Sequence, residues 1–117
     1  MSQPCINVAG NYQLRQSNGF TVEMTMSQDG DRLSGFCRHS GGVPSDSISG
    51  TVSNEHVDFN IKWSGGSEGH YWGDLQSGFF TGNWDGVLKG RTQDVHHPES
   101  QASWEVTNRV FRRLVPA

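Results

Sequence analysis

Hydrophobic and polar residues alternate along most of this chain with a period of two, the spacing of a β-strand that buries one face. The clearest run lies between His56 and Trp63, where every second residue is apolar. Similar runs occupy residues 8–14, 20–26, 32–39, 47–53, 68–75, 87–95 and 101–114, separated by turn sequences such as "SNG", "SQDGD", "SNE" and "SGGS". No segment shows the spacing of an amphipathic helix, so the pattern predicts an all-β fold of sequential antiparallel strands.

The strand register beyond Leu75 has two interpretations. In the first, "SGFFTGNW" ends a long strand, and the Asp-Gly pair that follows it turns the chain into the next strand. In the second, "GFFTGNW" is a separate strand, which makes nine strands in all. "HHPES" is a loop in both interpretations, because Pro98 cannot donate a hydrogen bond to a central ladder.

Short antiparallel strands of this number favour a closed sheet. An open sheet of eight strands would leave two unpaired edges and one uncovered face. Closure removes the edges and gives the apolar residues one interior. We therefore predict a single domain over residues 1–117, an eight-stranded antiparallel up-and-down β-barrel, with a two-sheet sandwich as the alternative. Glycines recur in the predicted strands, as strong curvature requires: Gly10, Gly35, Gly50, Gly73, Gly82 and Gly90.

Composition and charge exclude several classes of function. The 117 residues suffice for one packed core, and four Trp, six Phe and two Tyr distinguish the chain from disordered sequences. Nine basic residues against twelve acidic ones give no electrostatic reason to expect a nucleic-acid partner. No apolar run is long enough for a membrane-spanning helix, so we expect no membrane partner.

The first ten residues, "MSQPCINVAG", lack the basic and apolar segments of a signal peptide. We expect a cytoplasmic protein if Met1 is the native start, and a secreted one if a leader has been removed. Cys5 and Cys37 are expected to be free thiols. The alternative is one disulfide between neighbouring strands of a secreted protein.

Five histidines raise the question of metal or catalytic chemistry. They are scattered without ligand spacing and no cysteine pair accompanies them, so we expect no metal and no cofactor. Asp94 with His96 or His97 could form an acid–base pair, as could His39 with an acidic residue across the barrel. The sequence holds no nucleophile elbow, P-loop or paired-carboxylate motif. We predict a non-enzymatic protein, and a small enzyme using a His/Asp pair is the second alternative.

A series of short motifs resembles the avidin and streptavidin family. "GNY" resembles the G-x-W that opens their first strand, "RLSGFCR" their L-T-G-T-Y strand, and "FNIKW" their F-T-V-x-W segment. "ISGTV", "YWG", "VLK" and "SWEVTNRVFRRL" follow in the family's order, so the resemblance runs from Gly10 to Leu114. It implies an eight-stranded barrel that binds a small molecule, and assembly into a dimer or tetramer.

The same resemblance implies a set of ligand-binding residues. Two positions where avidins hydrogen-bond biotin carry Leu14 and Cys37, so we expect an altered pocket that does not bind biotin very tightly. Trp104 falls on the Trp that avidins donate across a subunit interface. Together with Ser67, which the residue pattern places in a pocket wall, the predicted ligand-binding residues are Asn18, His39, Trp63, Ser67, Tyr71, Thr92, Trp104 and Asn108.

Glycan recognition is the first alternative function. "SGGSEGHYWGD" and "FFTGNWDG" place Trp and Tyr beside Asn, Asp and Gly, a composition that can stack on a sugar ring and bind its hydroxyls. The two hypotheses differ in where the aromatic residues lie. An inward-facing cluster indicates a pocket at the barrel mouth, and aromatic residues in exposed loops indicate a lectin-like surface.

Overall fold

The computed structural model describes residues 6–77, 85–106 and 111–112. They form nine strands, whose bounds are β1 Gly10–Gln16, β2 Thr21–Asp29, β3 Arg32–His39, β4 Ser45–Ser53, β5 His56–Trp63, β6 Glu68–Ser77, β7 Asp85–Asp94, β8 Gln101–Val106 and β9 Phe111–Arg112. Buried and exposed positions alternate along them, as the hydrophobic pattern predicts. None of the described segments is a helix that could cross a membrane.

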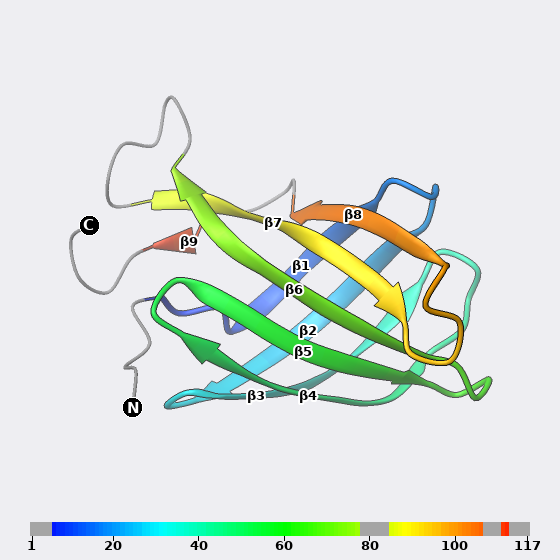
Figure 1. Cartoon of the computed structure of the whole chain (residues 1–117). Helices are drawn as coiled ribbons and strands as arrows, with labels where there is room; N and C mark the ends of the chain where they lie inside the picture. The colour runs from blue at the N-terminus through cyan, green and yellow to red at the C-terminus, as the bar shows by residue number, and fades with distance from the viewer. Residues whose placement is uncertain (1–5, 78–84, 107–110, 113–117) are drawn as a thin grey trace.

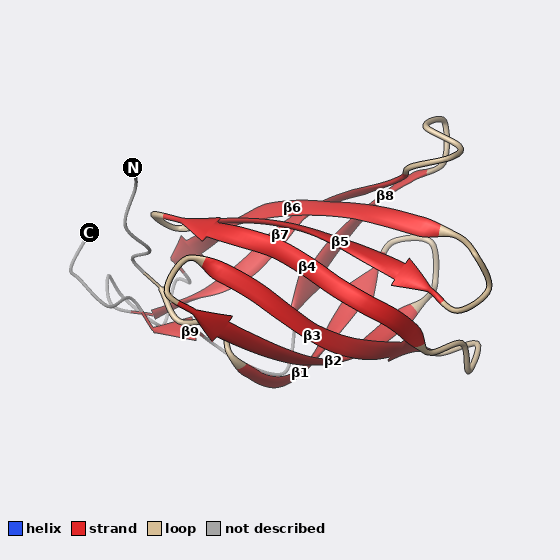
Figure 2. Cartoon of the chain, turned by 90° about the horizontal axis from the view of Figure 1, so that it is seen from below, coloured by secondary structure: helices blue, strands red, loops and turns tan. Residues whose placement is uncertain are grey.

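Strands β1 to β8 form a closed antiparallel barrel (Figures 1 and 2). Each strand pairs with the next along the chain, and pairing of β8 with β1 closes the circle. The predicted eight-stranded up-and-down barrel is confirmed, and the two-sheet alternative is wrong because one continuous ladder runs around the molecule.

The last third of the barrel differs in detail from the predicted register. The Asp-Gly pair at 85–86 begins β7 instead of forming a turn, and Gly86 pairs with both Ser77 and Phe111. Of the closing strand predicted over residues 101–114, the structure describes β8 and the short β9, which pair with separate parts of β7. Residues 78–84, the separate strand of the second interpretation, lie outside the described residues.

One end of the barrel is filled with apolar side chains. Ile6, Val8 and Phe111 are fully buried there. The Tyr12 ring lies edge-on to Phe111 at 4.9 Å, and its hydroxyl donates a 2.7 Å hydrogen bond to the Val8 carbonyl. The first and last strands place the described ends of the chain at this end of the molecule (Figure 1).

Two glycines allow β6 and β7 to approach closely. Gly73 and Gly90 are direct partners in the ladder. A Cβ atom at Gly90 would overlap the Trp72 carbonyl oxygen, and one at Gly73 would overlap the Lys89 carbonyl oxygen. Glycine is therefore required at both positions, which explains two of the glycines that the sequence places within strands.

A methyl group at Gly90 is expected to destabilise the barrel. Gly90→Ala forces β6 and β7 apart, and we expect a loss of about 1–3 kcal/mol in the free energy of unfolding, measured by chemical denaturation. Gly65→Ala is the matched control, because a Cβ there would meet no atom within 4 Å. We expect the control to change stability by less than about 1 kcal/mol. Equal denaturation midpoints for the two variants would contradict the steric argument.

Candidate functional site

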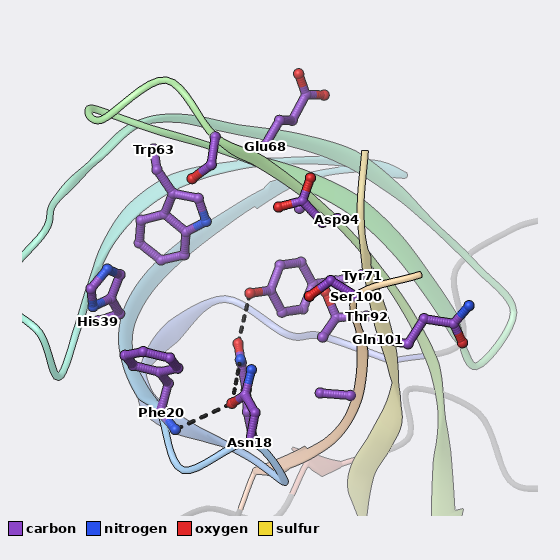
Figure 3. Close-up of a pocket in the computed structure, with 14 residues that line it drawn as sticks. Asn18, Phe20, His39, Trp63, Glu68, Tyr71, Thr92, Asp94, Ser100 and Gln101 are labelled. Carbon is purple, nitrogen blue, oxygen red and sulfur yellow. Dashed lines mark hydrogen bonds between the residues drawn. The ribbon is translucent and has the colours of Figure 1, made fainter. Parts of the chain in front are cut away.

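A pocket opens at the end of the barrel opposite the apolar plug, the end that Ile6, Val8 and Phe111 fill. Its volume is about 190 Å³, and 14 residues line it (Figure 3). They come from six of the eight barrel strands and from the loops that join strands at this end. The lining residues are Gln16, Asn18, Phe20, His39, Trp63, Ser67, Glu68, Gly69, Tyr71, Thr92, Asp94, Ser100, Gln101 and Ala102.

Strand direction explains why these residues meet. Antiparallel neighbours run in opposite directions, so the ends of β1, β3, β5 and β7 and the starts of the even-numbered strands share one mouth. The last inward-facing positions of three of these strands carry Gln16, His39 and Trp63. On β7, Thr92 is buried, and Asp94 lies one inward position nearer the opening.

Aromatic rings form one wall of the pocket. The Phe20 and His39 rings are 5.2 Å apart at 62°, and the His39 and Trp63 rings are 5.0 Å apart at 66°. Deeper in the barrel, Tyr71 stacks on Phe59 with ring centroids 5.3 Å apart. Edge-to-face and offset contacts of this kind hold the rings in fixed orientations. The Phe20, His39 and Trp63 rings therefore form a continuous aromatic surface.

A short chain of hydrogen bonds forms the floor. The Tyr71 hydroxyl donates to Gln16 Oε1 at 2.7 Å, and Gln16 Nε2 donates to Asn18 Oδ1 at 3.1 Å (Figure 3). Burial raises the pKa of Tyr71, and a hydrogen bond from Thr92 opposes that shift. Tyr71 is therefore an uncharged phenol and a hydrogen-bond donor. Gln16 and Thr92 are the buried polar side chains of the described part of the chain.

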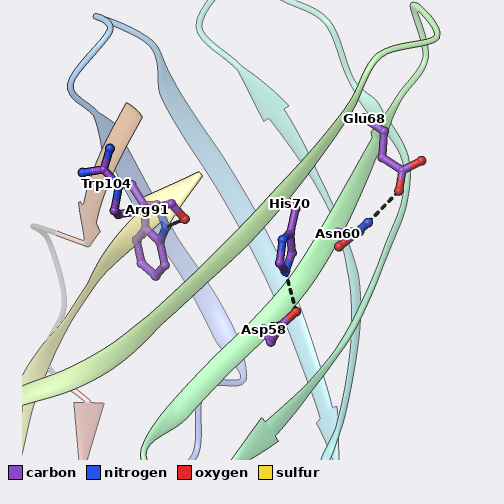
Figure 4. A network of polar contacts seen from close by, with 6 residues as sticks. All are labelled: Asp58, Asn60, Glu68, His70, Arg91 and Trp104. Carbon is purple, nitrogen blue, oxygen red and sulfur yellow. Dashed lines mark hydrogen bonds and ion pairs between the residues drawn. The ribbon is translucent and has the colours of Figure 1, made fainter. Parts of the chain in front are cut away.

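The rim of the pocket is acidic. Asp94 Oδ1 accepts hydrogen bonds from the backbone N–H groups of His96 and His97 at 2.8 and 2.9 Å. Glu68 Oε2 accepts from Asn60 Nδ2 at 2.6 Å on the outer face of the barrel (Figure 4). No Lys or Arg is among the described residues that line the pocket. The rim therefore carries negative charge without a basic partner.

The His39 ring is tethered to the loop that follows β3. Its Nδ1 accepts a 2.9 Å hydrogen bond from the backbone N–H of Gly41. The interaction ties the ring to the loop between β3 and β4, beside Phe20 and Trp63. His39 is therefore the central aromatic ring of the wall.

Six of the eight predicted site residues line this pocket: Asn18, His39, Trp63, Ser67, Tyr71 and Thr92. Trp104 does not. It is 3% exposed, packs against Phe59 in the core, and donates from Nε1 to the Arg91 carbonyl at 2.9 Å (Figure 4). Ala102 occupies the inward position nearer the mouth on the same strand, which leaves Trp104 below the floor. Asn108 lies outside the described residues.

Sequence analysis missed Gln16, Phe20 and Glu68 as site residues, and it considered Asp94 only for acid–base chemistry. All four stand at or beside a strand end. The topology of an up-and-down barrel supplies the signal that could have found them. Once strand ends are assigned, the residues at alternate ends belong to the same mouth.

Two histidines pair with aspartates across β5 and β6. His70 Nε2 lies 2.8 Å from Asp58 Oδ1 (Figure 4), and His56 Nδ1 lies 3.0 Å from Asp74 Oδ1. Both pairs join β5 to β6 on the outer face of the barrel, away from the pocket. The described residues contain no group of three His, Cys, Asp or Glu side chains that could hold a metal ion.

The aromatic residues considered for glycan binding divide between the two faces of the sheet. Tyr71 faces the pocket, and Trp72 lies half-buried on the outer face, with its ring 4.8 Å from His70. Most of the second segment, "FFTGNWDG", lies outside the described residues. Inward placement of Trp63 and Tyr71 is the arrangement that distinguishes a mouth pocket from a loop surface.

Cys37 is a free, buried thiol on the inner face of β3. Burial raises its pKa to about 11, and a hydrogen bond with Ser45 opposes that shift. A thiol with so high a pKa holds little thiolate at neutral pH and reacts slowly. Cys37 is therefore a packing residue.

Comparison with known proteins gives no family assignment. The sequence matches no protein-family model, and no curated protein matches it significantly. The geometry of the mouth is therefore the basis for a functional proposal.

Titration of Cys37 is expected to destabilise the protein in alkaline solution. Its folded-state pKa lies above the unfolded value, so the unfolded chain loses its proton first as the pH rises. We expect the free energy of unfolding to fall by about 1–3 kcal/mol between about pH 9 and pH 11. Urea denaturation across that range measures the fall, and Cys37→Ala should reduce the slope below pH 10. An unchanged slope in the variant would assign the effect to another group.

Proposed function

We propose that this protein is a non-enzymatic, small-molecule-binding β-barrel, related in architecture to the avidins but with a different ligand specificity. The observation that carries the proposal is the mouth pocket of about 190 Å³, which combines an aromatic wall with a hydrogen-bonded polar floor. Pockets that bind small molecules typically combine apolar walls with a few fixed polar groups.

The rest of the barrel interior is packed. Below the floor, apolar side chains leave an internal void of only about 10 Å³, which is too small for a ligand. The space at the mouth exceeds the cavity of about 150 Å³ that holds a benzene ring in another protein. The contrast supports a ligand with a single ring or a small fused ring system, held at the mouth.

Two substitutions support a ligand other than biotin. Leu14 and Cys37 stand where the avidin resemblance implies hydrogen-bonding groups, and both are buried in the apolar core, at 1% and 5% exposure. Neither lines the pocket. A biotin-like ligand would lose about 1–3 kcal/mol for each hydrogen bond that these two side chains do not make with it. The resemblance therefore supports a shared barrel with a shallower pocket.

The titratable side chains at the mouth support binding over catalysis. His39 Nδ1 accepts a hydrogen bond from the Gly41 N–H, and Glu68 is hydrogen-bonded to Asn60 on the outer face, so Asp94 is the carboxylate that faces the opening. A general acid and a general base must both reach the substrate. The hydrogen bonds at the rim instead fix the shape of the pocket, as a binding site requires.

A thermal-shift titration tests the proposal with single-ring heterocycles, biotin and a panel of sugars. At 100 times its dissociation constant, a ligand stabilises the folded state by about 2.7 kcal/mol. We expect stabilisation by ring compounds, and weaker or no effect from biotin. A shift with sugars alone would favour the glycan-binding alternative.

Two exposed phenylalanines provide a matched pair of variants. Phe20 is 45% exposed at the pocket, and Phe36 is 63% exposed on the outside of β3. We expect Phe20→Ala to weaken binding of an active ring compound by about 10-fold or more, and Phe36→Ala to leave it unchanged. Each variant loses a similar exposed ring, so a difference in affinity between them is due to the position of the ring. Equal affinities in isothermal titration would place the ligand elsewhere.

Trp63→Ala tests whether the buried ring of the aromatic wall contacts the ligand. Trp63 is 9% exposed and contacts His39, so truncation is expected to cost about 3–5 kcal/mol of folding free energy. The same change should abolish binding at temperatures where the variant is folded. Circular dichroism confirms folding, and retained ligand affinity in the folded variant would remove Trp63 from the site.

A further inference from the structure

The rim and wall of the pocket together indicate the charge of the ligand. We infer that the pocket selects a ring-bearing organic cation, such as a protonated amine, and that Asp94 is its counter-ion. The inference rests on the proposed function and adds to it the chemical class of the ligand. It concerns the same mouth pocket, and its arguments are the charge of the lining residues, the placement of Asp94 and the properties of the aromatic faces.

The described lining residues contain two carboxylates and no Lys or Arg. Asp94 and Glu68 supply the negative charge, and the His39 ring packs between Phe20 and Trp63. The chain as a whole carries a formal net charge of -3, so no distant excess of basic residues compensates the rim. A carboxylate or phosphate ligand would face uncompensated repulsion there.

Asp94 is the carboxylate that is placed to meet a ligand. It occupies an inward-facing position two residues beyond Thr92, and its side chain lines the opening (Figure 3). Two backbone N–H groups hold Oδ1, which fixes the orientation of the carboxylate. Among the described residues no side chain forms an ion pair with Asp94. Glu68 differs, because its carboxylate is turned outward to Asn60.

Aromatic faces beside a carboxylate are suited to a cation. The negative face of an aromatic ring attracts an ammonium group, and the attraction is greatest for Trp. Figure 3 shows the Trp63 indole and the Asp94 carboxylate directed toward the same space, with the Tyr71 ring lower in the view. A ligand ring packed against Trp63 and Phe20 would leave its ammonium group free to donate a charge-assisted hydrogen bond to Asp94.

Three probes of matched shape test the charge: phenethylammonium, phenethyl alcohol and phenylacetate. They share a benzene ring and a short chain, and differ in charge at its end. Isothermal titration at pH 8 and low salt should show phenethylammonium binding at least 10-fold tighter than the alcohol, with phenylacetate weakest. Added salt should weaken binding of the amine alone. Equal affinities for amine and alcohol, or tighter binding of the acid, would overturn the inference.

Asp94→Asn removes the charge and keeps an oxygen that can hold the two backbone N–H groups. We expect it to lower the affinity for phenethylammonium by about 10-fold and to change that for phenethyl alcohol less than about twofold. Asp29→Asn is the control, because it removes an equal charge at the opposite end of the barrel. An equal effect of both variants, or none from Asp94→Asn, would reject Asp94 as the counter-ion.

The Phe20→Ala variant separates this inference from the proposed function. If amine and alcohol bind equally and both are weakened by Phe20→Ala, the mouth pocket stands and its selectivity for cations is wrong. If Phe20→Ala changes the affinity for neither probe, the probes bind elsewhere and the mouth pocket itself is rejected. Absence of binding by all three probes at millimolar concentration would overturn the assignment of a ring-bearing cation.

Discussion

Closure of the sheet is the constraint on which the rest of this structure depends. Because β8 pairs with β1 and β6 with β7, every barrel strand has a partner on each side. Each side chain must then point either into a narrow interior or outward, and its register decides how deep it lies. Closure also depends on close backbone contact between β6 and β7, where the facing glycines Gly73 and Gly90 leave no room for side chains. The pairing of the strands therefore determines which side chains reach the pocket.

The interior divides into an apolar lower part and a polar mouth. Ile6, Val8 and Phe111 fill one end, and aromatic and aliphatic side chains fill the middle. At the other end Gln16 and Thr92 are buried but polar, and the Tyr71 hydroxyl connects them to the core. Buried polar groups are costly unless they are hydrogen-bonded, so this small network is stable only with its members in place. Because this network forms the floor of the pocket, it also fixes the shape of the pocket there.

Much of the fold and part of the site could be predicted from sequence. The run from Val57 to Trp63 identifies its strand because period-two alternation survives wherever one face is buried. The aromatic wall was partly predictable, since Trp63 and Tyr71 fall on inward positions near strand ends. Trp104 was assigned to the ligand site from the avidin resemblance. Its depth could not be predicted, because it depends on pairing with Gln16 across β1 and β8, 88 positions apart in the chain. Asp94 was understood only as a partner of nearby histidines, because the loop that it holds appears only in the folded chain.

Separation of the plug from the mouth has a consequence for how such a protein can evolve. The residues that determine folding are concentrated in the ladder and at the closed end. The loops at 17–20, 40–44, 64–67 and 95–100 surround the opening and contribute little to the core. Substitutions in those loops can accumulate at low cost in stability, since surface positions tolerate change well. A barrel built this way can acquire a new ligand through its loops while its scaffold remains constant, so loop sequences should diverge faster than the strands that carry them.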